Sequence, residues 1–360
     1  MIRRIVCITG LISQPRFVKR VQTLCEAGFE VIVVGYERGG YNCNALPENI
    51  TFINKGTQKN AGAYLSKIKS GYMDVKGLID KYGNKETLFY SFSLLTALWF
   101  YMRKASYIYE ISDILYGYNR MKLVQPIMRK IDKLVIKHSA LTIMTSQGFK
   151  QYILGKKEVN NVIVQPNKVN VKLSVKKRTV FNANKKLNFS FVGAIRYFDT
   201  VLRFAKIIGQ NYPQYTFHFF GDSSFAQAFK NECKDFDNVL FHGKFKNPED
   251  LESIYSQTDI VIACYEHKNL NERIAEPNKM YEAMLFCKPI VVSENTFLAE
   301  QVRKNECGYV INAYSDNDIN SFIKNLTIDS INKISQKELL IPESSLKDNP
   351  QVIIDYIKKL

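Results

Sequence analysis

Short runs of β-branched and aromatic residues recur along the chain, and they alternate with segments whose apolar positions repeat every three or four residues. The short runs are typical of buried parallel strands, and the longer periodic segments are typical of the helices that cover them. This alternation predicts β-α-β units with right-handed crossovers. Strands are expected at residues 5–9, 31–34, 107–111, 141–144, 162–164, 187–192, 215–220, 239–241, 260–263 and 290–292, and residues 88–92 fit either a strand or the start of a helix.

The alternation occurs in both halves of the chain, whose 360 residues are enough for two domains of about 100 to 200 residues each. We therefore predict an α/β protein with two doubly wound, Rossmann-like domains at residues 1–168 and 183–342, a basic linker at 169–182 and a helical tail at 343–360. Ligands of doubly wound sheets bind beyond the carboxyl ends of the strands. In the first domain the residues at this place are Gly10, Arg16, Ser112 and Asp113.

One segment of the second half combines a sharply defined helix start with a polar face. Pro277 suits the first turn of a helix, because its missing N–H costs nothing there, and Glu276 before it can cap the helix. Asn278 and Glu282 are four residues apart and share one helical face, with Lys279 beside them. Free N–H groups at a helix start favour anions, and a carboxylate can accept the hydrogens of two neighbouring hydroxyl groups. The segment therefore indicates a nucleotide-sugar site.

The formal net charge of +16 attracts nucleic acid, anionic lipid or small anions. Basic residues are dense between residues 150 and 186, and residues 121–138 read as an amphipathic helix with lysines and arginines around Leu123, Ile127 and Leu134. Such a helix either binds an anionic bilayer or has a solvated outer face, and both interpretations stay open.

Several classes of protein are disfavoured. The apolar stretch at 94–102 is far shorter than the ~20 residues of a membrane-spanning helix. Seven cysteines without a Cys-x-x-Cys pair support neither a disulfide framework nor a zinc site, so a reducing cytoplasm is expected. Neither Gly10 nor Gly193 opens the glycine fingerprint of a redox dinucleotide site, and no recognised nucleic-acid motif is present.

The order of Pro277-Asn278-Lys279, Glu282, Lys288-Pro289 and an apolar strand resembles the retaining GT-B glycosyltransferases of family 4, also called group 1. The resemblance implies a GT-B fold, in which two Rossmann-like domains face each other across a cleft. It also implies that the last helix, within residues 343–360, returns to the N-terminal domain. No metal and no cofactor are expected, because the nucleotide sugar is a substrate.

The resemblance also implies roles for individual residues. In the family the glutamate of this helix holds the ribose hydroxyls, a place taken here by Glu282, and the helix start faces the donor diphosphate. The implied catalytic residues are Arg196 and Lys279, the implied donor-binding residues are Gly193, Gly243, Lys244, Pro277, Asn278, Lys279, Met280 and Glu282, and the implied acceptor-side residues are Gly10, Arg16, Ser112 and Asp113.

The chain departs from the family pattern at three places. Ala194 and Asp199 stand where the family often has Arg and Lys, and Ser112 stands where many relatives have His, so no general base is assigned. Ile274 stands at the position of the first of two paired glutamates. The residues that can replace this glutamate are Glu272, Arg273 and Glu276, unless the donor sugar is held in another way.

The expected activity is transfer of a sugar, with retention, from a UDP-sugar or GDP-sugar to a glycan or a lipid-linked oligosaccharide in the synthesis of a cell-surface polysaccharide. A cytoplasmic location with peripheral attachment to the inner membrane face follows from this activity. The alternatives are a nucleotide-sugar 2-epimerase of the same fold, which changes the donor without an acceptor, and a non-enzymatic basic nucleic-acid-binding protein.

Overall fold

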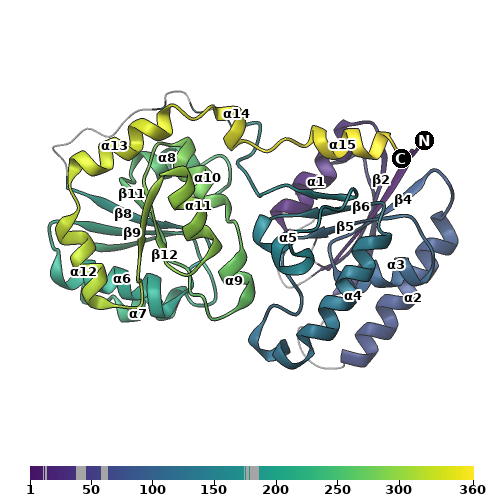
Figure 1. Cartoon of the computed structure of the whole chain (residues 1–360), viewed down its shortest axis with the longest axis horizontal. Helices are drawn as coiled ribbons and strands as arrows, with labels where there is room; N and C mark the ends of the chain where they lie inside the picture. Colours follow the sequence, from purple (N-terminus) through teal and green to yellow (C-terminus); the bar gives the residue numbers. More distant parts are fainter. Residues whose placement is uncertain are drawn as a thin grey trace. The chain divides into compact units, whose positions relative to one another are not determined.

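The computed structural model describes residues 1–10, 12, 14–37, 46–57, 64–173, 175, 178 and 186–360, and it divides the chain into two compact units. Unit 1 comprises Met1–Gln165 and Asn349–Leu360, and unit 2 comprises Pro166–Asp348. Each unit is built on one sheet with helices on both faces (Figure 1). The predicted α/β class with two doubly wound, Rossmann-like halves is confirmed.

The sheet of unit 1 has the strand order β3-β2-β1-β4-β5-β6-β7, and all neighbouring strands are parallel. The order reverses between β1 and β4, which is the switch point where ligands of such sheets bind. The strands are β1 (Arg4–Thr9), β2 (Glu30–Glu37), β3 (Thr51–Thr57), β4 (Thr87–Ser91), β5 (Tyr107–Ile111), β6 (Leu141–Met144) and β7 (Val162–Val164). The helices are α1 (Pro15–Glu26), α2 (Tyr64–Tyr82), α3 (Leu94–Met102), η2 (Asn119–Val124), α4 (Gln125–His138), α5 (Gln147–Leu154) and α15 (Gln351–Lys358).

Helix α15 ends the chain but packs in unit 1. Its isoleucines at positions 353, 354 and 357 are buried in one cluster with Phe17 and Val21 of α1. Figure 1 shows α1 and α15 on one face of the sheet and α2, α3 and α4 on the other. The apolar stripe of α15 therefore covers the N-terminal sheet, whereas residues 343–348, which we expected to be part of the same tail, belong to unit 2.

The sheet of unit 2 has the order β10-β9-β8-β11-β12-β13, again with all neighbours parallel and with the switch point between β8 and β11. The strands are β8 (Asn188–Val192), β9 (Thr216–Phe220), β10 (Val239–Gly243), β11 (Ile260–Ala263), β12 (Ile290–Ser293) and β13 (Gly308–Ile311). The helices are η3 (Phe198–Leu202), α6 (Arg203–Asn211), α7 (Ala226–Glu232), α8 (Leu251–Ser256), α9 (Leu270–Ile274), α10 (Asn278–Leu285), α11 (Phe297–Asn305), α12 (Asp316–Asn325), α13 (Ile328–Leu339) and α14 (Glu343–Leu346).

The start of unit 2 differs from the prediction, because residues 166–173 already belong to it. Arg178, within the predicted linker 169–182, donates to five main-chain carbonyls. A guanidinium is stable there because helix C-termini carry partial negative charge. These carbonyls, at or just beyond the ends of α10 and α13, are those of Met284, Leu285, Glu338, Leu339 and Ile341. The predicted linker's residues 174, 176, 177 and 179–182, and Lys185 of the basic stretch, lie outside the described residues.

Candidate functional site

Three strands of unit 2 have a glycine at or directly after their carboxyl end. The amide of Gly193, after β8, donates to the carbonyl of Phe220 at 2.7 Å, and the amide of Gly221, after β9, donates to that of Gly243 at 2.8 Å. A side chain at Gly221 would place its Cβ 1.9 Å from the carbonyl oxygen of Gly193. Both Gly193 and Gly221 also have positive φ angles, of 132° and 140°, which side chains disfavour. Bare backbone therefore lies beside the switch point.

Lys279 brings a positive charge to this bare backbone. A Cβ at Gly193 would lie 2.7 Å from the Nζ atom of Lys279, so the ammonium group is directly beside the glycine. The same Nζ lies 5.5 Å from the ring centre of Phe191 and 5.8 Å from that of Tyr265, which are cation–π distances. Among the residues that the structure describes, no carboxylate pairs with Lys279. The ammonium is thus held in place by aromatic rings and can still bind an anion.

Arg196 lies in the same aromatic cluster. Its guanidinium is 5.0 Å from the ring centre of Tyr197, and Tyr197 stacks on Tyr265 with 4.8 Å between ring centres. The ammonium group of Lys279 also lies over the ring of Tyr265, so the two stacked tyrosines contact both of the predicted catalytic cations. Tyr265 was not predicted as a site residue, although only Cys264 separates it from the end of β11 at the ligand-binding edge.

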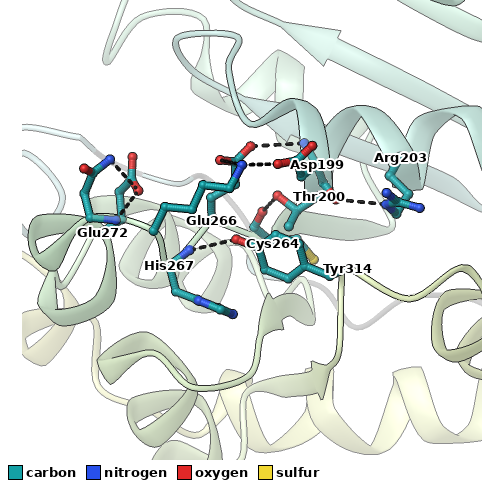
Figure 2. Close-up of polar contacts among 10 residues, drawn as sticks. Asp199, Thr200, Arg203, Cys264, Glu266, His267, Glu272 and Tyr314 are labelled. Carbon is teal, nitrogen blue, oxygen red and sulfur yellow. Dashed lines mark hydrogen bonds and ion pairs between the residues drawn. The ribbon is translucent and has the colours of Figure 1, made fainter. Parts of the chain in front are cut away.

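The start of η3 is occupied by the protein's own carboxylates (Figure 2). The amide of Asp199 donates to Oε1 of Glu266 at 3.0 Å, and the carboxylate of Asp199 pairs with Lys268. Lys268 also lies 3.6 Å from Glu266. The neighbouring contacts of the loop are from Thr200 Oγ1 to the carbonyl of Cys264 and from the amide of His267 to the hydroxyl of Tyr314 at 3.0 Å. An anion, Asp199, therefore stands where the resemblance implies a cation, and Lys268 neutralises it.

Glu282 is a buried carboxylate and not a solvated surface residue, since only 3% of it is exposed. It accepts hydrogen bonds from the hydroxyl of Tyr255 at 2.9 Å and from Nδ2 of Asn278 at 2.7 Å. Nδ2 of Asn247 is a third, longer donor at 3.4 Å. The predicted pairing of Asn278 with Glu282 on one helical face is present. Asn247 and Tyr255 come from distant parts of the chain, so the sequence could not place them here.

The start of α10 differs in detail from the prediction. The helix begins at Asn278, and Pro277 is the N-cap residue with φ of −76° and ψ of 151°, one position earlier than expected. Glu276 accepts a hydrogen bond from the hydroxyl of Tyr281, and its capping of the helix stays a prediction. A proline side chain has no atom that accepts a hydrogen bond, and the first N–H groups of α10 therefore lack a cap from the N-cap side chain.

The residues that could replace the missing first glutamate of the pair make contacts within their own segment. Glu272 completes a capping box with Asn269 at the start of α9, and Glu276 binds Tyr281 as described above. Arg273 is exposed, and Ile274 is the last residue of α9. Glu266 is a further carboxylate at this edge of the sheet, and the sequence did not select it.

Two of the implied donor-binding residues, Lys244 and Met280, lie where their side chains are less suited to contact a ligand than those of Lys279 and Glu282. Lys244, after the glycine that ends β10, has a side chain that is 85% exposed and lies 4.0 Å from Asp222. Met280 is 1% exposed and belongs to the hydrophobic core of unit 2. Any contact of Met280 with a ligand would therefore involve its backbone.

In unit 1 the implied acceptor-side residues follow β1 and β5. Gly10 and Asp113 are exposed, and Ser112 is half-buried. Arg16 is buried, with Nη1 3.4 Å from the carboxylate of Glu110, which also accepts from Arg20 and from Tyr90. Burial acts to raise the pKa of Glu110, but the guanidinium groups and the tyrosine hydroxyl lower it below its ordinary value. Arg16 thus belongs to a buried ion cluster within reach of this edge.

Within the described ranges, no three His, Cys, Asp or Glu side chains gather in a way that could hold a metal ion. The prediction that the reaction needs no metal and no cofactor stays a prediction.

The comparisons with known proteins agree with this geometry. Residues 175–338 match the family described as Glycosyl transferases group 1. Sucrose-phosphate synthase from Thermosynechococcus elongatus has a similar structure, with a TM-score of 0.72 and 13% sequence identity over 99% of this chain and 98% of that one. HepE from Anabaena, solved with UDP and glucose, has a TM-score of 0.69 and 16% identity over 99% of both chains. A trehalose-6-phosphate synthase, whose printed title concerns transfer with retention, has a TM-score of 0.70 and 11% identity over 99% of both chains.

No curated protein sequence matches the chain at a significant level. The structural similarities establish the GT-B fold of α/β type, and the family match covers most of unit 2. Together these findings indicate a glycosyltransferase.

Proposed function

We propose that the protein transfers a hexose from a UDP-hexose to a hydroxyl group of a glycan or a lipid-linked oligosaccharide. The observation that supports this most directly is the ammonium group of Lys279, which lies beside the backbone of Gly193 without a carboxylate partner among the described residues. A diphosphate can approach bare backbone closely and needs a cation beside it. UDP is favoured over GDP because HepE was solved with UDP and with UDP-glucose.

In this reaction the bond between the anomeric carbon and the diphosphate oxygen breaks, and a bond to the acceptor oxygen forms. Negative charge grows on the leaving diphosphate, so cations placed there stabilise the transition state more than the ground state. We assign this role to Lys279, to Arg196 on the same aromatic cluster, and to the first N–H groups of α10. The hydroxyl proton of the acceptor passes to an oxygen of the leaving phosphate, which requires no side-chain base. Retention of configuration is part of the proposal and is supported by the resemblance to retaining enzymes.

Glu282 is proposed to bind the ribose. Its carboxylate is already held by Tyr255 and Asn278, which fixes its orientation before the nucleotide binds. A carboxylate can accept more hydrogen bonds than the three described here, so ribose hydroxyls can join it or displace the long contact of Asn247.

The acceptor side is assigned to unit 1, with Gly10, Arg16, Ser112 and Asp113 at the carboxyl edge of its sheet. A lipid-linked acceptor for a cell-surface polysaccharide would place the enzyme in the cytoplasm and at the inner face of the membrane. No helix in the described part of the chain has both the length and the apolar character to cross a bilayer.

Titration calorimetry with UDP tests the donor site. Lys279→Met removes the charge but retains an apolar side chain over the two rings, and it is expected to weaken UDP binding by about 10- to 100-fold, as the loss of a charged hydrogen bond implies. Lys324→Met is the matched control, because that lysine is exposed on α12 and is not among the implied donor-binding residues, and it should change the affinity by less than about twofold. Equal affinities of the two variants would contradict the assignment. Incubation of the protein with UDP-hexose alone separates this function from epimerisation, because a transferase leaves the sugar stereochemistry of the donor unchanged.

A further inference from the structure

Unit 1 has an exposed apolar ridge where η2 meets α4, which we define as Leu123, Val124, Ile127 and Leu134. Leu123 is 95% exposed and Ile127 is 63% exposed, while Val124 and Leu134 are each 40% exposed. Ile127 and Leu134 are seven residues apart, so they share one face of α4. Single exposed apolar residues are common, but four that adjoin along one helix junction mark an interaction surface.

The anchoring of α4 keeps this ridge exposed. Asp132 is buried and accepts a hydrogen bond from the buried hydroxyl of Tyr116 at 2.8 Å. Val135 and Ile136 are buried next to it, so the inward face of α4 is fully used. Turning the ridge inward would expose a buried acid and two buried apolar residues.

A rim of basic side chains lies beside the ridge on η2 and α4. All five members are exposed, and among the residues that the structure describes none of them pairs with a carboxylate. The one acidic residue between positions 114 and 138 is Asp132, which is buried. The basic rim consists of Arg120, Lys122, Lys130, Lys133 and Lys137.

We propose that the ridge and its basic rim dock unit 1 onto a bilayer that contains anionic lipid. Leu123, Val124 and Ile127 would enter the boundary between head groups and acyl chains, while the rim binds lipid phosphates. A second copy of the chain is a poor occupant, because a symmetric contact would bring two basic rims together. Nucleic acid would bind the basic rim through its phosphates, but it would leave the exposed side chain of Leu123 without an apolar partner. The inference deepens the proposed function, since it names the membrane partner that a lipid-linked acceptor requires.

Sedimentation with vesicles tests the proposal, using phosphatidylcholine vesicles with and without phosphatidylglycerol. The full chain should sediment with the anionic vesicles and not with pure phosphatidylcholine. Leu123→Ser with Ile127→Ser should reduce the partition coefficient by about tenfold or more, given the apolar surface withdrawn from the lipid. Lys130→Glu with Lys133→Glu should reduce it by at least about 25-fold, because each cation near an anionic surface contributes about fivefold.

Matched controls place equal changes elsewhere. Leu339→Ser with Leu340→Ser removes two leucines of unit 2 that are 38% and 82% exposed, and Lys358→Glu with Lys359→Glu makes the same charge change at the C-terminal end of α15. The controls should retain vesicle binding, and circular dichroism checks that every variant is folded. The proposal is overturned if the native chain ignores anionic vesicles, if it binds both vesicle types equally, or if the control and ridge variants lose binding equally. Retention on DNA without vesicle binding also overturns it.

UDP calorimetry on the same variants separates this proposal from the donor site. The ridge variants should bind UDP normally, because none of the exchanged residues lies in unit 2. Loss of UDP binding by the native chain would contradict the proposed function and leave the vesicle result intact. Normal UDP binding without vesicle binding would contradict only the membrane surface.

Discussion

The exchange Glu282→Gln tests the most specific role in the donor site, which is the binding of ribose. The variant retains the shape of the side chain and one oxygen that can accept from Tyr255 at the present 2.9 Å. It replaces the oxygen that accepts from Asn278 with an amide donor, to which Asn278 can respond by turning its own amide oxygen inward. The variant should therefore fold, and any loss of UDP affinity should come from the missing negative charge that the ribose hydroxyls would contact.

The size of the effect follows from these contacts. Hydrogen bonds to a charged group contribute about 1.5 to 3 kcal/mol, and the amide retains part of one of them, so UDP affinity should fall by about 1 to 3 kcal/mol, or roughly 5- to 150-fold. The free energy of unfolding should fall by only about 1 kcal/mol. Glu282→Ala would be less informative, because it leaves the hydroxyl of the fully buried Tyr255 without its acceptor.

The assay compares two ligands that differ only in the nucleoside. Calorimetry should show weaker UDP binding by Glu282→Gln, whereas binding of inorganic diphosphate should stay as in the native chain. Lys279→Met should weaken both ligands, because its charge acts on the diphosphate. Tyr255→Phe is the matched control, since it removes one donor to Glu282 without touching the carboxylate. Unchanged UDP affinity in a folded Glu282→Gln variant would refute the ribose assignment, and an equal loss for diphosphate would show that Glu282 acts on the phosphates or on the fold.

Three further predictions concern the stability of the fold and its dependence on pH. Burial raises the pKa of Asp132 from 3.8 to about 6. The stability that its protonated form contributes is therefore present below the unfolded pKa and is lost as pH rises through 6. In urea unfolding the native chain should lose about 3 kcal/mol of unfolding free energy from this group between pH 4 and 7, and Asp132→Asn should not show this loss. Burial also raises the pKa of Glu338 well above its ordinary value, and within the described residues neither carboxyl oxygen has a hydrogen-bond partner. Glu338→Leu should therefore raise the melting temperature, more at pH 8 than at pH 5, and a lower melting temperature at both pH values would contradict this account. Gly221→Ala, with its Cβ 1.9 Å from the Gly193 carbonyl oxygen, should lower the free energy of unfolding by about 2 kcal/mol or more, and a neutral result would contradict the backbone approach described here.

The alternation of apolar runs was sufficient to predict the fold class and most of the strands. It failed at β3 and β13, which were not predicted. β3 is an edge strand whose run is interrupted by Asn54 and Lys55, and β13 is a four-residue edge strand with no fully buried position. Edge strands bury less surface, so their apolar signal is weaker than that of central strands such as β8.

The candidate site could be predicted where its residues are close in sequence. The spacing of Asn278 and Glu282 gave their shared face correctly, because a helix fixes that relation locally. The partners Tyr255, Asn247 and Tyr265 depend on which strand ends and loops come together, and no local pattern contains that information. The contact between the carboxylate of Glu276 and the hydroxyl of Tyr281 was not predicted either, and the expected cap by Glu276 stays a prediction.

The two helix starts at the carboxyl edge of the unit 2 sheet differ in charge, and this difference indicates where a diphosphate binds. At η3 the first amides meet Glu266, and Asp199 adds a second carboxylate, so an incoming anion would be repelled despite Lys268. At α10 the first amides have no cap from the N-cap residue, and Lys279 lies beside Gly193. The repulsion between a phosphate and a carboxylate at about 4 Å amounts to about 4 kcal/mol at an effective dielectric constant of 20, which exceeds the benefit of one helix dipole. The diphosphate should therefore bind at α10, and the replacement of the family's lysine by Asp199 makes Lys279 and Arg196 the cations on which the proposed transfer depends.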